Sequence, residues 1–211
     1  NDCKNWFRLG VIFAEQNKDA VVFSEMINEQ YLAFNRPEGN FQFSSPDIIL
    51  SYSKDLHSWG WPAQVRLSKK KGAWDSGRVG AGPPPIKTDK GWLLIYHGVI
   101  ERTRTKQGFF NEINNLFGVK KVKHRDIYCV GAALLDLKNP KKVLAKSKNP
   151  IIYPRRSYEK GTFEDKDVVF PTGLVMDLNG KDILLYSGGG DVVTTVKKIS
   201  LDEILNSLEK F

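Results

Sequence analysis

One layout recurs three times along the chain, and this repetition constrains the fold more than any other feature. Each unit has an apolar strand, a turn, a second strand that ends in a polar residue, and an outer strand that closes on a turn containing aspartate. Repeated units of three or four antiparallel strands are typical of β-propeller blades. A β-sandwich with accidental internal similarity is the alternative. The aspartates that close successive units are Asp2, Asp55, Asp136 and Asp202.

The chain holds about three such units and the end of a preceding one. Asp2 and Trp6 repeat the spacing of Asp55 and Trp59, but only the second pair follows a strand-like run. A propeller has about four to eight blades. We therefore expect an all-β chain whose residues 1–211 form a single, partial propeller, with earlier blades upstream of the first residue.

A loop rich in glycine and proline, Trp74–Ile86, opens the second unit. Glycine supplies backbone conformations that other residues avoid, and proline then fixes the path of the chain. A hairpin turn at Asp89–Gly91 leads into an apolar strand that ends beside His97. The loop therefore presents Arg78 rigidly and close in sequence to a titratable ring, which indicates a site for an anion or a sugar.

Charged residues also stand at the inner strand ends of the other units. In a propeller, such positions gather around one central cleft. Arginine offers a planar fork of donors that suits phosphate, and aspartate suits sugar hydroxyls. A salt bridge between blades is the alternative for any one of them. The residues at these positions are Lys18, Asp19, Arg36, Arg78, His97 and Asp191.

Residues 101–126 form an insertion between two strands of the second unit. Its apolar residues fall on one helical stripe, and Gly118 is placed to end that helix. We expect a short amphipathic helix packed on the edge of the domain; a contact with a second copy, in a homo-oligomer, or a lid over the cleft are the alternatives. The stripe consists of Phe109, Phe110, Ile113, Leu116 and Phe117.

Composition narrows the class of partner. The net charge of +8 comes with lysine clusters that we interpret as solvated surface, and it also suits steering of an anionic small substrate. No nucleic-acid-binding motif appears, and no apolar run approaches the ~20 residues that span a bilayer. The two cysteines, Cys3 and Cys129, are too few for a disulfide framework and favour a reducing cytoplasm.

Other catalytic motifs are weak. His57 and His124 lack partners at the spacing of metal ligands, so we expect no metal site. A glycosidase needs a carboxylic general acid, for which Asp19, Asp75 and Asp191 are candidates by position alone. A phosphorylase needs no general base, because phosphate itself is the nucleophile.

Six groups of short segments carry a family resemblance. They are Lys18–Phe23; Arg36-Pro37; Trp74-Asp75 with Arg78–Ile86; Gly91-Trp92 with Tyr96–Val99; Gly131–Asp136; and Phe170-Pro171 with Gly190-Asp191. In these segments, which extend over nearly the whole chain, the sequence resembles glycoside hydrolase family 130. That family consists of five-bladed β-propellers acting on β-mannosides. Most characterised members convert a β-mannoside and inorganic phosphate into mannose 1-phosphate with inversion, and others hydrolyse β-1,2-mannosides.

The resemblance implies a role for each candidate residue. It assigns Arg36, Arg78 and His97 to a phosphate site, with Lys18 as a further basic residue. It also implies that no cofactor is needed beyond phosphate as co-substrate, and that the general acid belongs to a blade upstream of residue 1. The residues expected to bind the β-manno-oligosaccharide are Asp191, Asp75, Tyr96 and Asp19.

Some positions depart from the family pattern. Asn35 stands where a histidine often precedes the arginine, and Ser24 replaces a usual proline. Both arginines and the histidine of the phosphate site are retained, which favours phosphorolysis. A β-mannosidase on the same scaffold and a non-catalytic propeller fragment that binds sugar or a partner are the alternatives.

Overall fold

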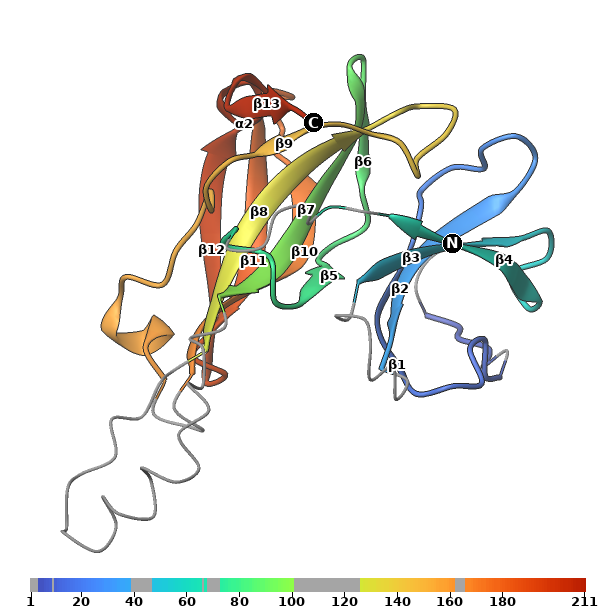
Figure 1. Cartoon of the computed structure of the whole chain (residues 1–211), viewed down its shortest axis with the longest axis horizontal. Helices are drawn as coiled ribbons and strands as arrows, with labels where there is room; N and C mark the ends of the chain where they lie inside the picture. Colours follow the sequence, from blue (N-terminus) through green and yellow to red (C-terminus); the bar gives the residue numbers. More distant parts are fainter. Residues whose placement is uncertain are drawn as a thin grey trace, which may run out of the picture.

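The computed structural model describes residues 4–8, 10–38, 47–65, 67, 73–100, 126–161 and 166–211 (Figure 1). These residues form two β-sheets, one of four strands and one of nine. The only helical elements among them are the 3-10 turn η1 (Ser157–Glu159) and the short helix α2 (Leu201–Asn206). The expected all-β class is confirmed.

The first sheet is a simple antiparallel meander. Neighbours in the sheet are also neighbours along the chain, which gives the strand order β1-β2-β3-β4. A tight turn at Asn28-Glu29 joins β1 to β2: both residues have positive φ, 50° and 61°, as a two-residue type I′ hairpin requires. The strands, in sheet order, are β1 (Asn17–Val22), β2 (Tyr31–Pro37), β3 (Ile48–Ser53) and β4 (Trp59–Val65).

The second sheet begins at one edge with a strand that is interrupted. β5 (Val79–Ala81) and β6 (Ile86–Thr88) both pair with β7 (Gly91–Ile100), and the Gly-Pro-Pro-Pro segment lies between them. Proline has no N–H to donate to a ladder, so the interruption falls where the prolines are. Two further strands continue the sheet, β8 (Ile127–Leu135) and β9 (Val143–Ser147).

The C-terminal meander joins the same sheet through a short parallel pairing of β10 with β8. Ser200 caps α2 by accepting a hydrogen bond from the Glu203 N–H at 3.3 Å. After α2 the chain returns to pair with β9, beside which it lies in Figure 1. The strands are β10 (Asp167–Met176), β11 (Asp182–Gly189), β12 (Val193–Ser200) and β13 (Leu208–Lys210).

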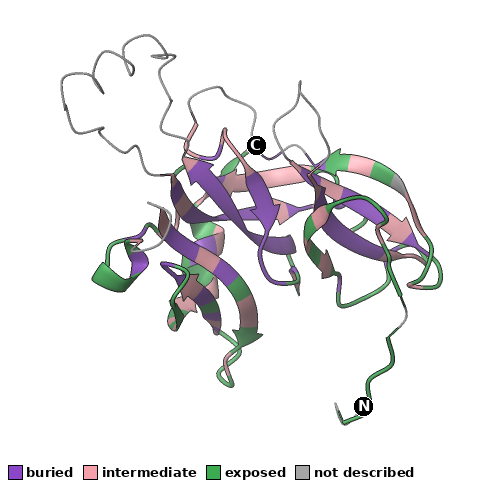
Figure 2. Ribbon diagram, turned by 90° about the horizontal axis from the view of Figure 1, so that it is seen from below, coloured by how far each residue is buried: buried purple, intermediate pink, exposed green. Residues whose placement is uncertain are grey.

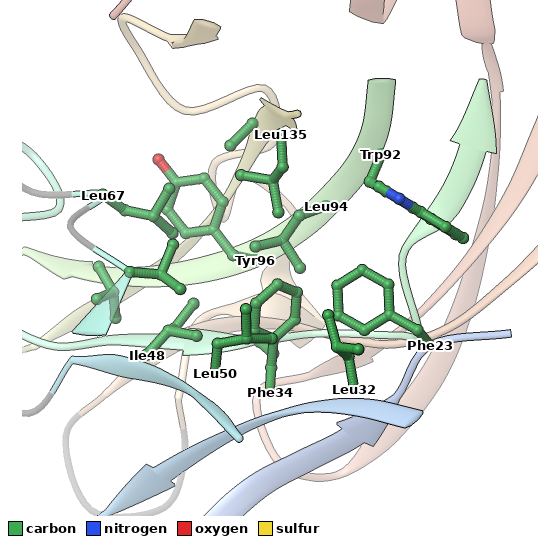
Figure 3. Close-up of a cluster of buried hydrophobic side chains, with 14 of the residues drawn as sticks. Phe23, Leu32, Phe34, Ile48, Leu50, Leu67, Trp92, Leu94, Tyr96 and Leu135 are labelled. Carbon is green, nitrogen blue, oxygen red and sulfur yellow. The ribbon is translucent and has the colours of Figure 1, made fainter. Parts of the chain in front are cut away.

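β7 lies between two apolar cores. Every residue of this strand is buried except the last, and buried residues concentrate in the central strands of Figure 2. Because successive side chains point to opposite faces, Trp92, Leu94 and Tyr96 pack with the first sheet, as Figure 3 shows. Leu93 and Ile95 pack with β10 and β11 on the other face. Both sheets therefore depend on the position of β7.

One prediction from the sequence cannot be compared with the structure, and three strands of the structure were not predicted. The predicted helix within residues 101–126 lies outside the described residues. β4, β9 and β13 were not foreseen from the sequence.

Cys129 is a buried free thiol, and burial raises its pKa to about 12. No helix in the described part of the chain is long and apolar enough to cross a membrane.

Candidate functional site

Arg36, Asp19 and His97 meet in a small buried cluster between the two sheets. Arg36 Nη1 lies 3.3 Å from His97 Nε2 and 3.2 Å from Asp19 Oδ2. Arg36 is 6 % exposed and His97 only 1 %. The structure therefore brings together three predicted site residues that come from β1, β2 and β7.

Gly80 makes room for this cluster. It pairs with His97 across β5 and β7, and an added Cβ would run into the Asp19 carboxylate and the His97 ring. Asp19 itself has a φ of 55°, in the left-handed region, at a register shift between β1 and β2. The path of the backbone thus aims the Asp19 carboxylate at Arg36.

Glu38 links the cluster to solvent. Its Oε1 lies 3.3 Å from Arg36 Nη2 and 3.0 Å from Lys18 Nζ. The hydrogen bond from Lys18 is the main reason that the pKa of Glu38 lies below its usual value. Lys18 is half exposed, so it forms the outer edge of the site rather than its centre.

Arg78 also acts on His97, because its charge lowers the pKa of the ring and both side chains lie against Tyr128. It donates a 2.7 Å hydrogen bond to Asp126, and its guanidinium lies 5.7 Å from the ring centre of Tyr128. The His97 ring packs at 4.4 Å between ring centres against Phe170, on β10. His97 therefore lies under the influence of two arginine side chains, each of which is paired with carboxylate.

His97 is held neutral. Burial, followed by the charges of Arg36 and Arg78, lowers its pKa to about 3. Because Arg36 can only donate, His97 Nε2 must accept, which assigns the ring proton to Nδ1. His97 Nδ1 and Arg36 Nε are both buried and have no hydrogen-bond partner among the described residues. The cluster thus contains two unsatisfied N–H donors.

Acid should destabilise the fold through His97. The pKa is lower in the folded state than in the unfolded chain, so the unfolded state binds more protons between about pH 6.5 and 3. We expect the free energy of unfolding to fall by about 2 kcal/mol between pH 7.5 and pH 5. Urea titrations of the native protein and His97→Asn across this range measure it. The same pH slope in both proteins would contradict the assignment.

Asp191 occupies the exposed turn between β11 and β12 and has a φ of 59°. The N–H of the preceding Gly190 donates to the Val168 carbonyl at 3.0 Å and anchors the turn. The structure does not place Asp191 in hydrogen-bond contact with Arg36 or His97. Its role in sugar binding stays a prediction.

Asp75 and Tyr96 belong to a second buried group, on the opposite face of β7 from His97. Asp75 Oδ2 accepts hydrogen bonds from the Tyr96 hydroxyl and from Lys146 Nζ, each at 2.8 Å. Asp75 is fully buried, and the Trp74 ring stacks on Tyr96. These side chains are bonded to one another rather than to the Arg36 cluster, and their contact with substrate stays a prediction.

Sequence reasoning missed several residues of both groups. Glu38 was detectable, because alternation along a strand places residues i and i+2 on one side. Lys146 gave no signal, since its strand β9 was not foreseen. In the described part of the chain, no group of three or more histidine, cysteine and acidic side chains is arranged to hold a metal ion. The other missed residues are Gly80, Asp126, Tyr128 and Phe170.

Comparison with known proteins finds the same similarity over most of the chain. Residues 2–210 match the family described as beta-1,4-mannooligosaccharide phosphorylase. The sequence is 38 % identical over 208 residues to the beta-1,2-mannobiose phosphorylase of Listeria innocua, which covers 99 % of this chain and 51 % of that protein. It is 28 % identical over 205 residues to the beta-1,4-mannooligosaccharide phosphorylase of Ruminococcus albus, covering 97 % of this chain and 54 % of that protein.

Solved structures also match this chain over most of its length. The Listeria innocua beta-1,2-mannobiose phosphorylase, in complex with beta-1,2-mannobiose, matches with a TM-score of 0.78 and 36 % identity, over 97 % of this chain and 50 % of that one. A putative glycosidase from Bacteroides thetaiotaomicron, 24 % identical, matches with a TM-score of 0.69 over 94 % of this chain and 57 % of that one, which shows the fold alone. The chain spans about half the length of the curated relatives it matches.

Proposed function

The chain belongs to glycoside hydrolase family 130, and from this membership we propose that it supplies the phosphate site of an inverting β-mannoside phosphorylase. The observation that carries the proposal is the pairing of Arg36 with a neutral His97 at 3.3 Å, with a free N–H donor on each side chain. Buried donors without partners are costly, and an anion accepted at this point would satisfy them.

Each residue has a defined part in this proposal. Arg36 offers its planar fork to phosphate oxygens, and His97 donates from Nδ1 without adding charge. Arg78 and Lys18 add positive charge at the outer edge. Asp19 and Glu38 hold Arg36 in place, and Asp126 holds Arg78, before the anion arrives.

The reaction follows from the anion held there. A phosphate oxygen attacks the anomeric carbon of the mannosyl unit, and the bond from that carbon to the acceptor oxygen breaks. An acid protonates the departing oxygen, so the products are mannose 1-phosphate and the acceptor sugar with the configuration inverted.

We also propose that the two sheets contribute three consecutive blades of a five-bladed propeller. Three antiparallel meanders support it: β1 to β4, the strands from β5 to β9, and β10 to β12. β1 carries Asp19, β5 carries Gly80 and β10 carries Phe170, so all three contribute to the His97 cluster. In a propeller, these would be the inner strands around the axis.

Hydrolysis on the same scaffold is the second candidate. The observation that favours it is that both arginines are already paired with carboxylates, which compete with phosphate for the same donors. A β-mannosidase would release free mannose, because water would take the place of phosphate as nucleophile. A propeller fragment that only binds sugar would release neither product.

One incubation separates these functions. The longest natural polypeptide that carries these residues is mixed with β-1,2- or β-1,4-mannobiose, with and without inorganic phosphate. We expect mannose 1-phosphate to form only when phosphate is present. Equal turnover without phosphate, with mannose as the product, would select the hydrolase. Binding of sugar or phosphate by calorimetry without any turnover would select the non-catalytic alternative.

A further inference from the structure

Asp19 is an acidic residue inside a site proposed to hold an anion. Its Oδ2 lies 3.2 Å from Arg36 Nη1 and 3.7 Å from His97 Nε2. The same oxygen is buried and has no hydrogen bond of good geometry among the described residues. The carboxylate therefore lies beside the arginine that is proposed to bind phosphate, and it is held there mainly by charge.

This carboxylate has little freedom to move away. Its side chain is only 10 % exposed, and the backbone of Gly80 lies directly against Oδ2. The left-handed backbone of Asp19, with a φ of 55°, further fixes where the side chain starts. An anion bound to Arg36 would consequently share a poorly solvated space with a second negative charge, and such a pair is unfavourable unless one charge is neutralised.

We propose that Asp19 takes up a proton when phosphate binds to Arg36, which makes this a proton-linked anion site. The inference rests on the proposed phosphate site. The proton comes from solvent and adds to Oδ2. The carboxyl group then becomes a hydrogen-bond donor to a phosphate oxygen. It also removes the ion pair between Asp19 and Arg36 Nη1, so one fewer carboxylate competes with the ligand for Arg36.

The surroundings of Asp19 favour this change. Burial already raises the pKa of Asp19, and Glu38 acts in the same direction, against the opposing effects of Arg36 and Lys18. From β7, His97 faces Asp19 as a neutral ring, and from β5 only Gly80 does. Affinity for a dianion should therefore fall as the pH rises, by up to about tenfold per pH unit while binding is coupled to one proton.

Calorimetry with sulfate tests this directly. Inorganic phosphate changes its own protonation near neutral pH, whereas sulfate stays a dianion. Binding heats measured between pH 5 and 7.5 in buffers of different ionisation enthalpy give the number of protons taken up. We expect about 0.5 to 1 proton per sulfate in the native protein. We expect almost none in Asp19→Asn, which keeps the shape without the charge. The matched control Glu38→Gln, on the same arginine but further out, should retain the uptake.

Each other outcome has a distinct meaning. Sulfate binding without proton uptake would overturn the inference and leave the phosphate site intact. Uptake that persists in Asp19→Asn but disappears in His97→Asn would place the proton on the ring and also overturn it. Failure of both sulfate and phosphate to bind would overturn the site and the inference together. Should Asp19→Asn not fold, the carboxyl carbon shift of Asp19 in the native protein must move to its protonated value when sulfate saturates the site, or the inference falls.

Discussion

Replacing Arg36 by alanine is expected to lower phosphate-dependent turnover on the order of 10²- to 10³-fold, the loss seen when one preorganised donor to a developing charge is removed. The substitution deletes the fork that contacts His97 and leaves the carboxylates of Asp19 and Glu38 without their shared cation. Both effects oppose a bound phosphate. The measurement is the rate of mannose 1-phosphate formation as a function of phosphate concentration.

Two variants serve as controls for this result. Arg36→Lys keeps the charge but loses the planar fork, so an intermediate loss is expected. Lys18→Met removes a cation at the exposed outer edge, where solvent screens its effect, and should change turnover far less. A folded Arg36→Ala protein with unchanged phosphate dependence would refute the phosphate site. The proposed chemistry would then have to involve other residues.

Local signals made the strands predictable. The apolar run from Ile48 to Ser53 forms β3, and the turns at Asn28-Glu29 and Asn179-Gly180 join antiparallel strands that pair with each other. Each of these depends on residues close in sequence, where hydrophobic alternation and turn chemistry act directly. β4 was harder to foresee because Gly60 and Pro62 interrupt its pattern.

The site was predictable only in part. Charged or titratable side chains beside apolar runs identified Arg36, Arg78 and His97, although β7 continues past His97 to Ile100 and does not end there. The counter-charge of Arg78 was not identified, because Asp126 lies 48 residues further along the chain. The same holds for Asp75, since its partner Lys146 is 71 residues away. Contacts over such distances depend on tertiary packing, which no local pattern encodes.

Lys146→Met is expected to destabilise the fold by about 3–5 kcal/mol, because it leaves the Asp75 carboxylate charged and buried. Lys146 donates to Asp75 Oδ2 at 2.8 Å and to the Leu67 carbonyl at 2.7 Å. It thus joins β9 to the segment that leads out of the first sheet. With about 2–4 °C of melting temperature per kcal/mol for a chain of this size, a loss on the order of 10 °C should be seen by calorimetry or circular dichroism.

A double variant distinguishes two causes of this loss: a buried Asp75 carboxylate left without a partner, and the loss of the other contacts of Lys146. In Asp75→Asn with Lys146→Met, no charge remains, and the amide oxygen still accepts from Tyr96, which donates to this position at 2.8 Å in the native protein. The double variant should therefore be more stable than Lys146→Met alone, by about 1–3 kcal/mol. Additive losses would instead mean that Lys146 acts through packing and its bond to Leu67. In that case the group around Asp75 would stabilise the join between the sheets without depending on its charge.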